Sequence, residues 1–149
     1  LDGTSKRQGA ELASWFNFTD NLVLYVAYTY LDAREPEEDG RAELEIRRPR
    51  HIASANLNYL FLNERGRFNL NVDYNGEQED IAFIPPTYDE RVTLDAFTLV
   101  NALLSFKVID NLELYVRGEN LTDEEYEEVY GFRGQSRAGY LGLRFDWSL

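Results

Sequence analysis

Residues 120–147 begin Asn120-Leu-Thr-Asp-Glu-Glu-Tyr-Glu-Glu-Val-Tyr-Gly-Phe132, pass through a short polar segment and end Tyr140-Leu-Gly-Leu-Arg-Phe-Asp-Trp147. In the final segment, apolar side chains from Leu141 onward occupy every second position. Alternation with this period places the apolar residues on one face of an extended strand and the polar residues on the other. An apolar strand that ends in an aromatic residue suits a membrane barrel wall, where aromatics lie at the lipid–water interface.

This stretch resembles the C-terminus of TonB-dependent outer-membrane receptors. In that family an Asn-Leu-x-Asp-x-x-Tyr segment, here Asn120 to Tyr126, leads into a loop and a final strand that ends in an aromatic residue. The longer string from Tyr126 to Phe132 is most similar to the vitamin B12 (cobalamin) branch. Members usually end on the aromatic itself, whereas here Ser148-Leu149 follows it.

Composition limits the classes of protein to which the chain can belong. Its 149 residues are enough for one domain with a core, and aromatic residues make up 14% of them. A net charge of −12 argues against nucleic-acid binding, because phosphates would be repelled. The absence of cysteine excludes disulfides and thiolate chemistry within the chain. A mean hydropathy of −0.48 is compatible with a membrane barrel, because only alternate residues of each strand face lipid.

Alternation along the rest of the chain predicts seven strands with alternating short and long connections. The expected strands are 8–19, 22–32, 50–62, 68–75, 97–109, 112–119 and 140–147. The short connections are 20–21, 63–66 and 110–111, and the long ones are 33–48, 76–95 and 120–137. Short turns at one end of the sheet and long loops at the other are typical of outer-membrane barrels. Soluble up-and-down barrels can show the same rhythm.

The fold class predicted is all-β, an antiparallel up-and-down meander of about seven strands. The polar face of the fourth strand is almost entirely Asn and Asp, which suits a wet or plug-filled lumen. The resembled receptors have about 22 strands around a plugged lumen. The resemblance therefore implies that residues 1–149 are the C-terminal part of such a barrel, with the plug domain and earlier strands upstream. The chain starts at Leu1 without a recognisable signal peptide, so we expect it to begin inside a longer protein or to have been processed.

The resemblance also implies a function, location and set of partners. It implies active import across the Gram-negative outer membrane of cobalamin first, or an iron–siderophore complex second. The partners implied are outer-membrane lipid, the plug domain, TonB, the barrel assembly machinery and a large small-molecule ligand, without nucleic acid. The alternative is a stand-alone small β-barrel binding module, either a membrane barrel or a lipocalin-like soluble carrier.

Two groups of candidate site residues follow. Aromatic and arginine side chains in the long connections could grip a large substrate, or could pack one loop against another. They are Tyr88, Arg91, Tyr130, Phe132 and Arg133. In the resembled family the last strand is the signal read by the assembly machinery. Its residues here are Tyr140, Leu143, Phe145 and Trp147.

The sequence predicts no catalytic residue, no cofactor and no metal site. His51 is the sole histidine, and no nucleophile or phosphate-binding motif appears. Acidic runs at 35–39 and 123–128 could hold Ca²⁺, but they lack the spacing of a calcium loop and are better interpreted as solvated loops. The basic patch of Arg47, Arg48 and Arg50 has two equal interpretations, which are contact with lipid phosphates and pairing with neighbouring acids.

Overall fold

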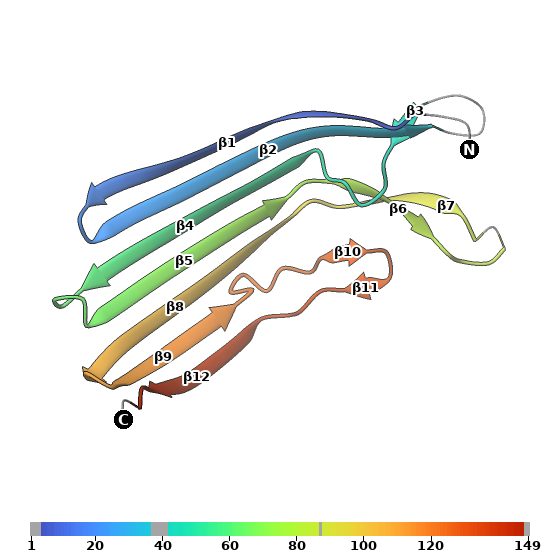
Figure 1. Cartoon of the computed structure of the whole chain (residues 1–149). Coiled ribbons are helices and arrows are strands. Elements are labelled where there is room, and N and C mark those ends of the chain that lie inside the picture. Colours follow the sequence, from blue (N-terminus) through green and yellow to red (C-terminus); the bar gives the residue numbers. More distant parts are fainter. Residues whose placement is uncertain (1–3, 37–41, 87, 148–149) are drawn as a thin grey trace.

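The computed structural model describes residues 4–36, 42–86 and 88–147, and this part of the chain is entirely β-strand and connection. None of the described residues forms a helix long and apolar enough to cross a membrane. Seven strands run side by side in chain order (Figure 1). They are β1 (Lys6–Thr19), β2 (Leu22–Pro36), β4 (His51–Phe61), β5 (Gly66–Asn75), β8 (Phe97–Ile109), β9 (Leu112–Glu119) and β12 (Ala138–Phe145).

Every neighbouring pair in this sheet is antiparallel, as the alternation of short turns predicts. The short connections, at residues 20–21, 62–65 and 110–111, all lie at one end of the sheet, and the three long connections lie at the other end (Figure 1). The predicted antiparallel meander is therefore confirmed.

The long connections contain more strand than the sequence indicated. β3 (Ala42–Leu44) pairs with the end of β2, while β6 (Gln78–Ala82) pairs with β7 (Glu90–Leu94) and β10 (Glu127–Val129) with β11 (Phe132–Arg133). The predicted loop at 33–48 is wrong at both ends of its first part, because residues 33–36 continue β2 and Ala42–Leu44 form β3 against it. Residues 45–48 form no strand, and residues 37–41 lie outside the described residues. At the other end of the chain, β12 stops at Phe145 rather than at the predicted residue 147.

Strand register separates apolar from polar side chains. Leu70 lies opposite Leu57 on one side and Ala102 on the other, and all three share the apolar face. The next residue, Asn71, lies between Asn56 and Asn101 on the polar face. The same alternation extends to β12, where Leu143 lies opposite Leu114 and Arg144 opposite Glu113. The predicted two-faced sheet is confirmed.

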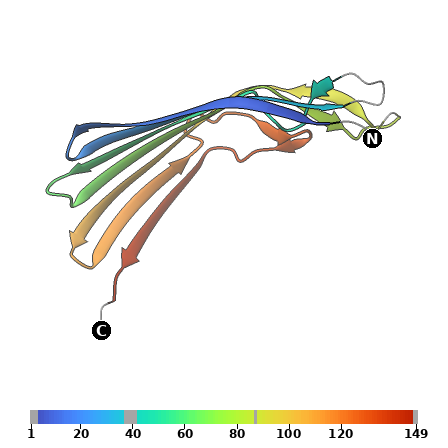
Figure 2. The ribbon, with the colours of Figure 1, turned by 45° about the horizontal axis from the view of Figure 1, so that its top comes forward.

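The apolar face does not enclose a core. Figure 2 shows the seven strands as one curved layer that leads into the hairpins of the long connections. Large apolar side chains on this face stay exposed, including Leu141 at 82% and Leu143 at 66%. Among the described residues, the buried apolar side chains are Ala33, Ala82, Leu94 and Phe97, all toward the end of the long connections. Close packing therefore occurs there rather than along the wall.

Candidate functional site in the long connections

We use the term loop cluster for residues 42–50, 76–86, 88–96 and 120–137, the described parts of the three long connections. Its third connection is organised by Asn120, which is 4% exposed. The side-chain amide donates to the carbonyls of Glu124 and Gln135, both at 2.9 Å, and accepts from the amide of Glu124 at 2.9 Å. One side chain therefore joins the start of this connection to its end.

The other residues of the recognised motif also have structural contacts. Leu121 covers Gly118, where an added Cβ would meet the leucine side chain. Asp123 accepts hydrogen bonds from the backbone and the guanidinium of Arg137 at 3.0 and 3.2 Å. Tyr126 packs on Phe97 with ring centroids 4.6 Å apart. The motif thus specifies the shape of the connection.

Asp80 lies at the centre of the loop cluster and is fully buried. Its Oδ1 accepts from Arg47 Nε at 2.8 Å and from the Ile81 amide at 2.9 Å, while Oδ2 accepts from the Tyr130 amide at 2.7 Å. Burial raises the pKa of Asp80, but these hydrogen bonds and the Arg47 charge outweigh it and hold the pKa below its ordinary value. The carboxylate is therefore ionised at neutral pH.

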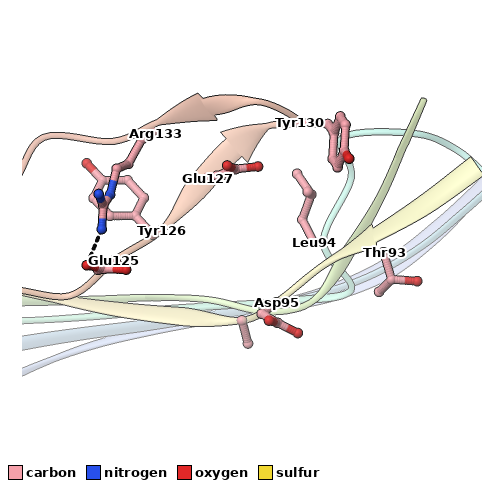
Figure 3. A pocket seen from close by; sticks show the side chains of 9 residues that line it. Thr93, Leu94, Asp95, Glu125, Tyr126, Glu127, Tyr130 and Arg133 are labelled. Carbon is pink, nitrogen blue, oxygen red and sulfur yellow. Dashed lines mark ion pairs between the residues drawn. The ribbon is translucent and has the colours of Figure 1, made fainter. Parts of the chain in front are cut away.

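A cavity of about 520 Å³ lies between the end of β7 and the third connection (Figure 3). Its volume falls within the range of about 300–1,000 Å³ that is usual for small-molecule sites. The lining combines two tyrosine rings with three carboxylates and one guanidinium. Its residues are Thr93, Leu94, Asp95, Ala96, Glu125, Tyr126, Glu127, Tyr130 and Arg133. Arg133 pairs with Glu125, so the balance of charge in the lining is negative.

The structure brings together two of the five predicted ligand residues. Tyr130 and Arg133 both line the cavity. Phe132 is 74% exposed and lines a separate hollow on the β10–β11 hairpin. Tyr88 lies exposed in the β6–β7 hairpin, away from the cavity lining. Arg91 pairs with Glu43 at 2.8 Å and donates to the Leu44 carbonyl, so its guanidinium joins two connections.

Sequence reasoning missed the acidic wall of the cavity. Asp95 was placed at the end of a long connection, and Glu125 and Glu127 within a solvated acidic run. In the structure Asp95, Glu125 and Glu127 belong to the same cavity lining as Tyr130. Leu94 points toward the hairpin that carries Tyr130, and Asp95 leaves β7's end on the opposite side from Leu94 (Figure 3). The sequence does contain one indication that these carboxylates could line a site. They stand beside aromatic residues, in connections that emerge at the same end of the sheet.

Each arginine of the patch before β4 pairs with a neighbouring acid, although Arg50 Nε has no hydrogen-bond partner among the described residues. Arg47 pairs with Asp80, whereas Arg48 lies 3.6 Å from Glu45 and Arg50 lies 3.6 Å from Asp32. Glu45 also accepts two hydrogen bonds from Arg7, which lower its pKa. The pairing interpretation of the patch is therefore the one that the geometry supports.

The polar face of the wall carries its own hydrogen-bond network. Asn69 donates to Asn58 at 2.9 Å, and Asn58 donates to Asn56 at 2.6 Å. Glu113 accepts from the Ser105 hydroxyl at 2.6 Å and from Arg144 at 3.0 Å. Side chains linked in this way form a polar surface.

The predicted assembly residues divide between the two faces of β12. Leu143 and Phe145 lie on the apolar face, and Trp147 packs edge-on against Phe145 at 6.0 Å. Tyr140 lies on the polar face, because it pairs with Arg117, whose guanidinium is 4.6 Å from the tyrosine ring. Ser148-Leu149 lies outside the described residues, as do the acidic residues 37–39. Within the described chain, no group of three or more His, Cys, Asp or Glu side chains is placed to hold a metal ion.

Comparison with known proteins agrees with this architecture. The sequence profile described as "TonB dependent receptor-like, beta-barrel" matches residues 1–121. The chain belongs to the TonB-dependent receptor β-barrel family. Family membership places the apolar face of the wall toward lipid and the polar face toward the lumen. It also places the chain in the outer membrane of Gram-negative bacteria.

The similar curated proteins are vitamin B12 transporters named BtuB. The chain is 34% identical over 140 residues to the one from Photobacterium profundum, covering 94% of this chain and 21% of that protein. It is 30% identical over 111 residues to the one from Vibrio cholerae, covering 74% of this chain and 18% of that protein. The chain thus spans about a fifth of the length of these relatives.

Solved structures of the family share the fold at lower identity. The ferripyoverdine receptor of the outer membrane of Pseudomonas aeruginosa aligns with a TM-score of 0.79 at 18% identity, over 96% of this chain and 20% of that one. The ferric-catecholate import receptor Fiu from E. coli K12 aligns with a TM-score of 0.76 at 20% identity, over 97% of this chain and 22% of that one. The soluble-carrier alternative is not favoured by any of these likenesses.

Proposed function

We propose that this chain is the C-terminal part of the barrel of a TonB-dependent receptor that imports cobalamin. The sheet supports this proposal, because in the described part of the chain its edge strands β1 and β12 each pair with a single neighbour. A wall in lipid must pair every strand edge, so the complete barrel requires further strands. In this proposal the plug domain lies upstream, and energy comes from TonB through that plug.

The charge of the cavity is the observation that carries the choice of ligand. Three carboxylates and one guanidinium favour a ligand that is rich in hydrogen-bond donors and has no net negative charge. Cobalamin fits this description, because its corrin ring carries neutral primary amides. An anionic ferric siderophore would face the carboxylates of Asp95, Glu125 and Glu127. The cavity would take one edge of so large a ligand, with Tyr126 and Tyr130 against its apolar surface.

The runner-up is import of an iron–siderophore complex. The solved neighbours are siderophore receptors, but at 18–20% identity their likeness concerns the fold alone. The cobalamin proposal draws additional support from relatives at 30–34% identity that are vitamin B12 transporters. Transport, rather than an enzymatic reaction, is the role of these relatives.

Ligand titration of the full receptor that contains this chain tests the proposal. We expect purified receptor to bind cyanocobalamin and to prefer it to a ferric catecholate. Replacing Asp95→Asn together with Glu127→Gln should weaken cyanocobalamin binding about tenfold or more, since each hydrogen bond to a charged group contributes about 1.5–3 kcal/mol. The matched control is Glu128→Gln, in the same hairpin but outside the cavity lining. Tighter binding of the ferric catecholate by the wild-type receptor would contradict the proposal.

A further inference from the structure

Strand β6 lies between the two other connections of the loop cluster and contacts both. The Arg47 amide donates to the Glu79 carbonyl at 2.7 Å, which joins the segment before β4 to β6. On the other side, Gln78 Nε2 donates to the Glu128 carbonyl at 2.8 Å, which joins the third connection to β6. Gln78 is itself buried, so this contact lies inside the cluster.

Among the described residues, Asp80 is the one whose side chain forms hydrogen bonds to both neighbouring connections. One carboxylate oxygen accepts from Arg47 and the other from the Tyr130 amide. These partners are 33 and 50 residues away in sequence. A carboxylate is almost never fully buried unless it is paired, so its position depends on these contacts.

We propose that Asp80 is a positioning residue for ligand capture. Its ionised carboxylate holds the β10–β11 hairpin and the segment before β4 against β6, and thereby fixes the Tyr130 side of the cavity. Asp80 does not line the cavity, so it acts on the ligand through Tyr130. The part of the inference that concerns cobalamin rests on the proposed function, whereas the part that concerns loop order does not.

Removing the charge should separate the three connections. In Asp80→Asn one oxygen becomes an amide donor, which cannot accept from Arg47 or from Tyr130. One donor then loses its partner, and the charge-assisted component of the remaining contacts is lost. The size of the side chain is unchanged, so repacking does not compete as an explanation.

The test is hydrogen exchange on the full-length receptor in lipid nanodiscs, after heat-modifiable mobility has shown that the barrel is folded. In Asp80→Asn we expect exchange of residues 127–133 and 43–48 to accelerate about tenfold or more, with the wall strands unchanged. Arg47→Gln removes one partner without altering β6, and it should accelerate exchange of residues 43–48 with a smaller effect at 127–133. Asp89→Asn, an exposed carboxylate of the same hairpin, is the matched control and should match the wild type.

Uptake of radiolabelled cyanocobalamin separates positioning from general structural damage. We expect Asp80→Asn to raise the concentration for half-maximal uptake while the maximal rate per folded receptor stays unchanged. The inference would be overturned if residues 127–133 of Asp80→Asn exchanged at the wild-type rate. It would also be overturned if the variant lowered the maximal rate of uptake without changing the concentration for half-maximal uptake. If the wild-type receptor does not bind cyanocobalamin, the proposed function fails, and the exchange data still decide whether Asp80 holds the connections together.

Discussion

Asn120 shows how much one amide side chain can determine in a long connection. It adopts a positive φ of 47°, a conformation in which asparagine is several-fold enriched. Its side chain satisfies two carbonyls and one amide of the connection. The sequence motif containing Asn120 was recognised from its residues, but the reason for asparagine could not be deduced, because Gln135 lies 15 residues away.

Asn120→Ala should loosen the third connection. The substitution leaves the carbonyls of Glu124 and Gln135 without their amide donor, and each lost hydrogen bond costs about 0.5–1.5 kcal/mol of local stability. Limited proteolysis of the full receptor should cut residues 121–137 faster, while the wall remains intact. Asn120→Gly is the informative comparison, because glycine accepts the positive φ but lacks the amide. Protease resistance equal to wild type in Asn120→Gly would show that backbone conformation, rather than the amide, requires asparagine.

Asp80 makes the loop cluster sensitive to acid. Its pKa is lowered in the folded state, so its contribution to stability is complete above the ordinary pKa of about 3.9 and is lost as pH falls through the depressed value. The chain has no cysteine, so Glu128→Cys offers a single attachment point within it for a nitroxide label. We expect the label to stay immobile from pH 7 to about 4 and to become mobile below that.

The same label on an Asp80→Asn background provides the control. There it should be mobile already at pH 7, and its mobility should change less on acidification. Equal titration curves on the two backgrounds would assign the acid sensitivity to other carboxylates, such as Glu45.

At the scale of elements, the wall strands could be predicted from sequence and the strands of the long connections could not. Wall strands alternate because lipid and lumen impose period two on every residue. Strand β6 reads Gln78-Glu-Asp-Ile-Ala82, and its buried positions include Gln78 and Asp80. From alternation alone, such polar residues are predicted to face solvent. Their burial becomes clear only from partners in other connections, which no local pattern contains.

Adjacent positions on β5 test the assignment of faces. Val72 lies on the apolar face and Asn71 on the polar face, one residue apart. Val72→Lys should destabilise the barrel in lipid by up to about 2–4 kcal/mol, because a cation on the lipid-facing side of the wall is costly. Asn71→Lys, at nearly the same depth but toward the lumen, should cost much less. Urea unfolding of the receptor in lipid vesicles measures both, and equal losses would contradict the assignment of faces.

At the scale of the whole molecule, the open edges of the sheet connect folding with assembly. Strand β12 pairs with β9 along its whole length and has no second neighbour among the described residues. An exposed edge with an apolar face is an aggregation hazard until it is paired. We propose that the assembly machinery first binds this edge by β-augmentation, in which backbone hydrogen bonds give affinity and alternate side chains give specificity. The first strand of the complete barrel then replaces it.

The side chains that would be read are Leu143 and Phe145 on the apolar face, Trp147 beyond them, and Tyr140 on the polar face. Phe145→Asp should therefore lower the amount of folded receptor in the outer membrane, because it places a charge among the apolar side chains at the end of β12. Ligand affinity of the receptors that do assemble should hardly change. Phe145 is the last residue of β12, and that end of the strand lies away from β7 and the β10–β11 hairpin, whose residues line the cavity (Figure 1). Tyr130→Ala should give the reverse result, with normal assembly and weaker cyanocobalamin binding. Heat-modifiable mobility of membrane fractions and ligand titration of purified receptor measure the two effects separately. If Phe145→Asp assembled normally but no longer bound the ligand, β12 would belong to ligand capture instead. The assignment of assembly to one end of the sheet and ligand binding to the other would then be wrong.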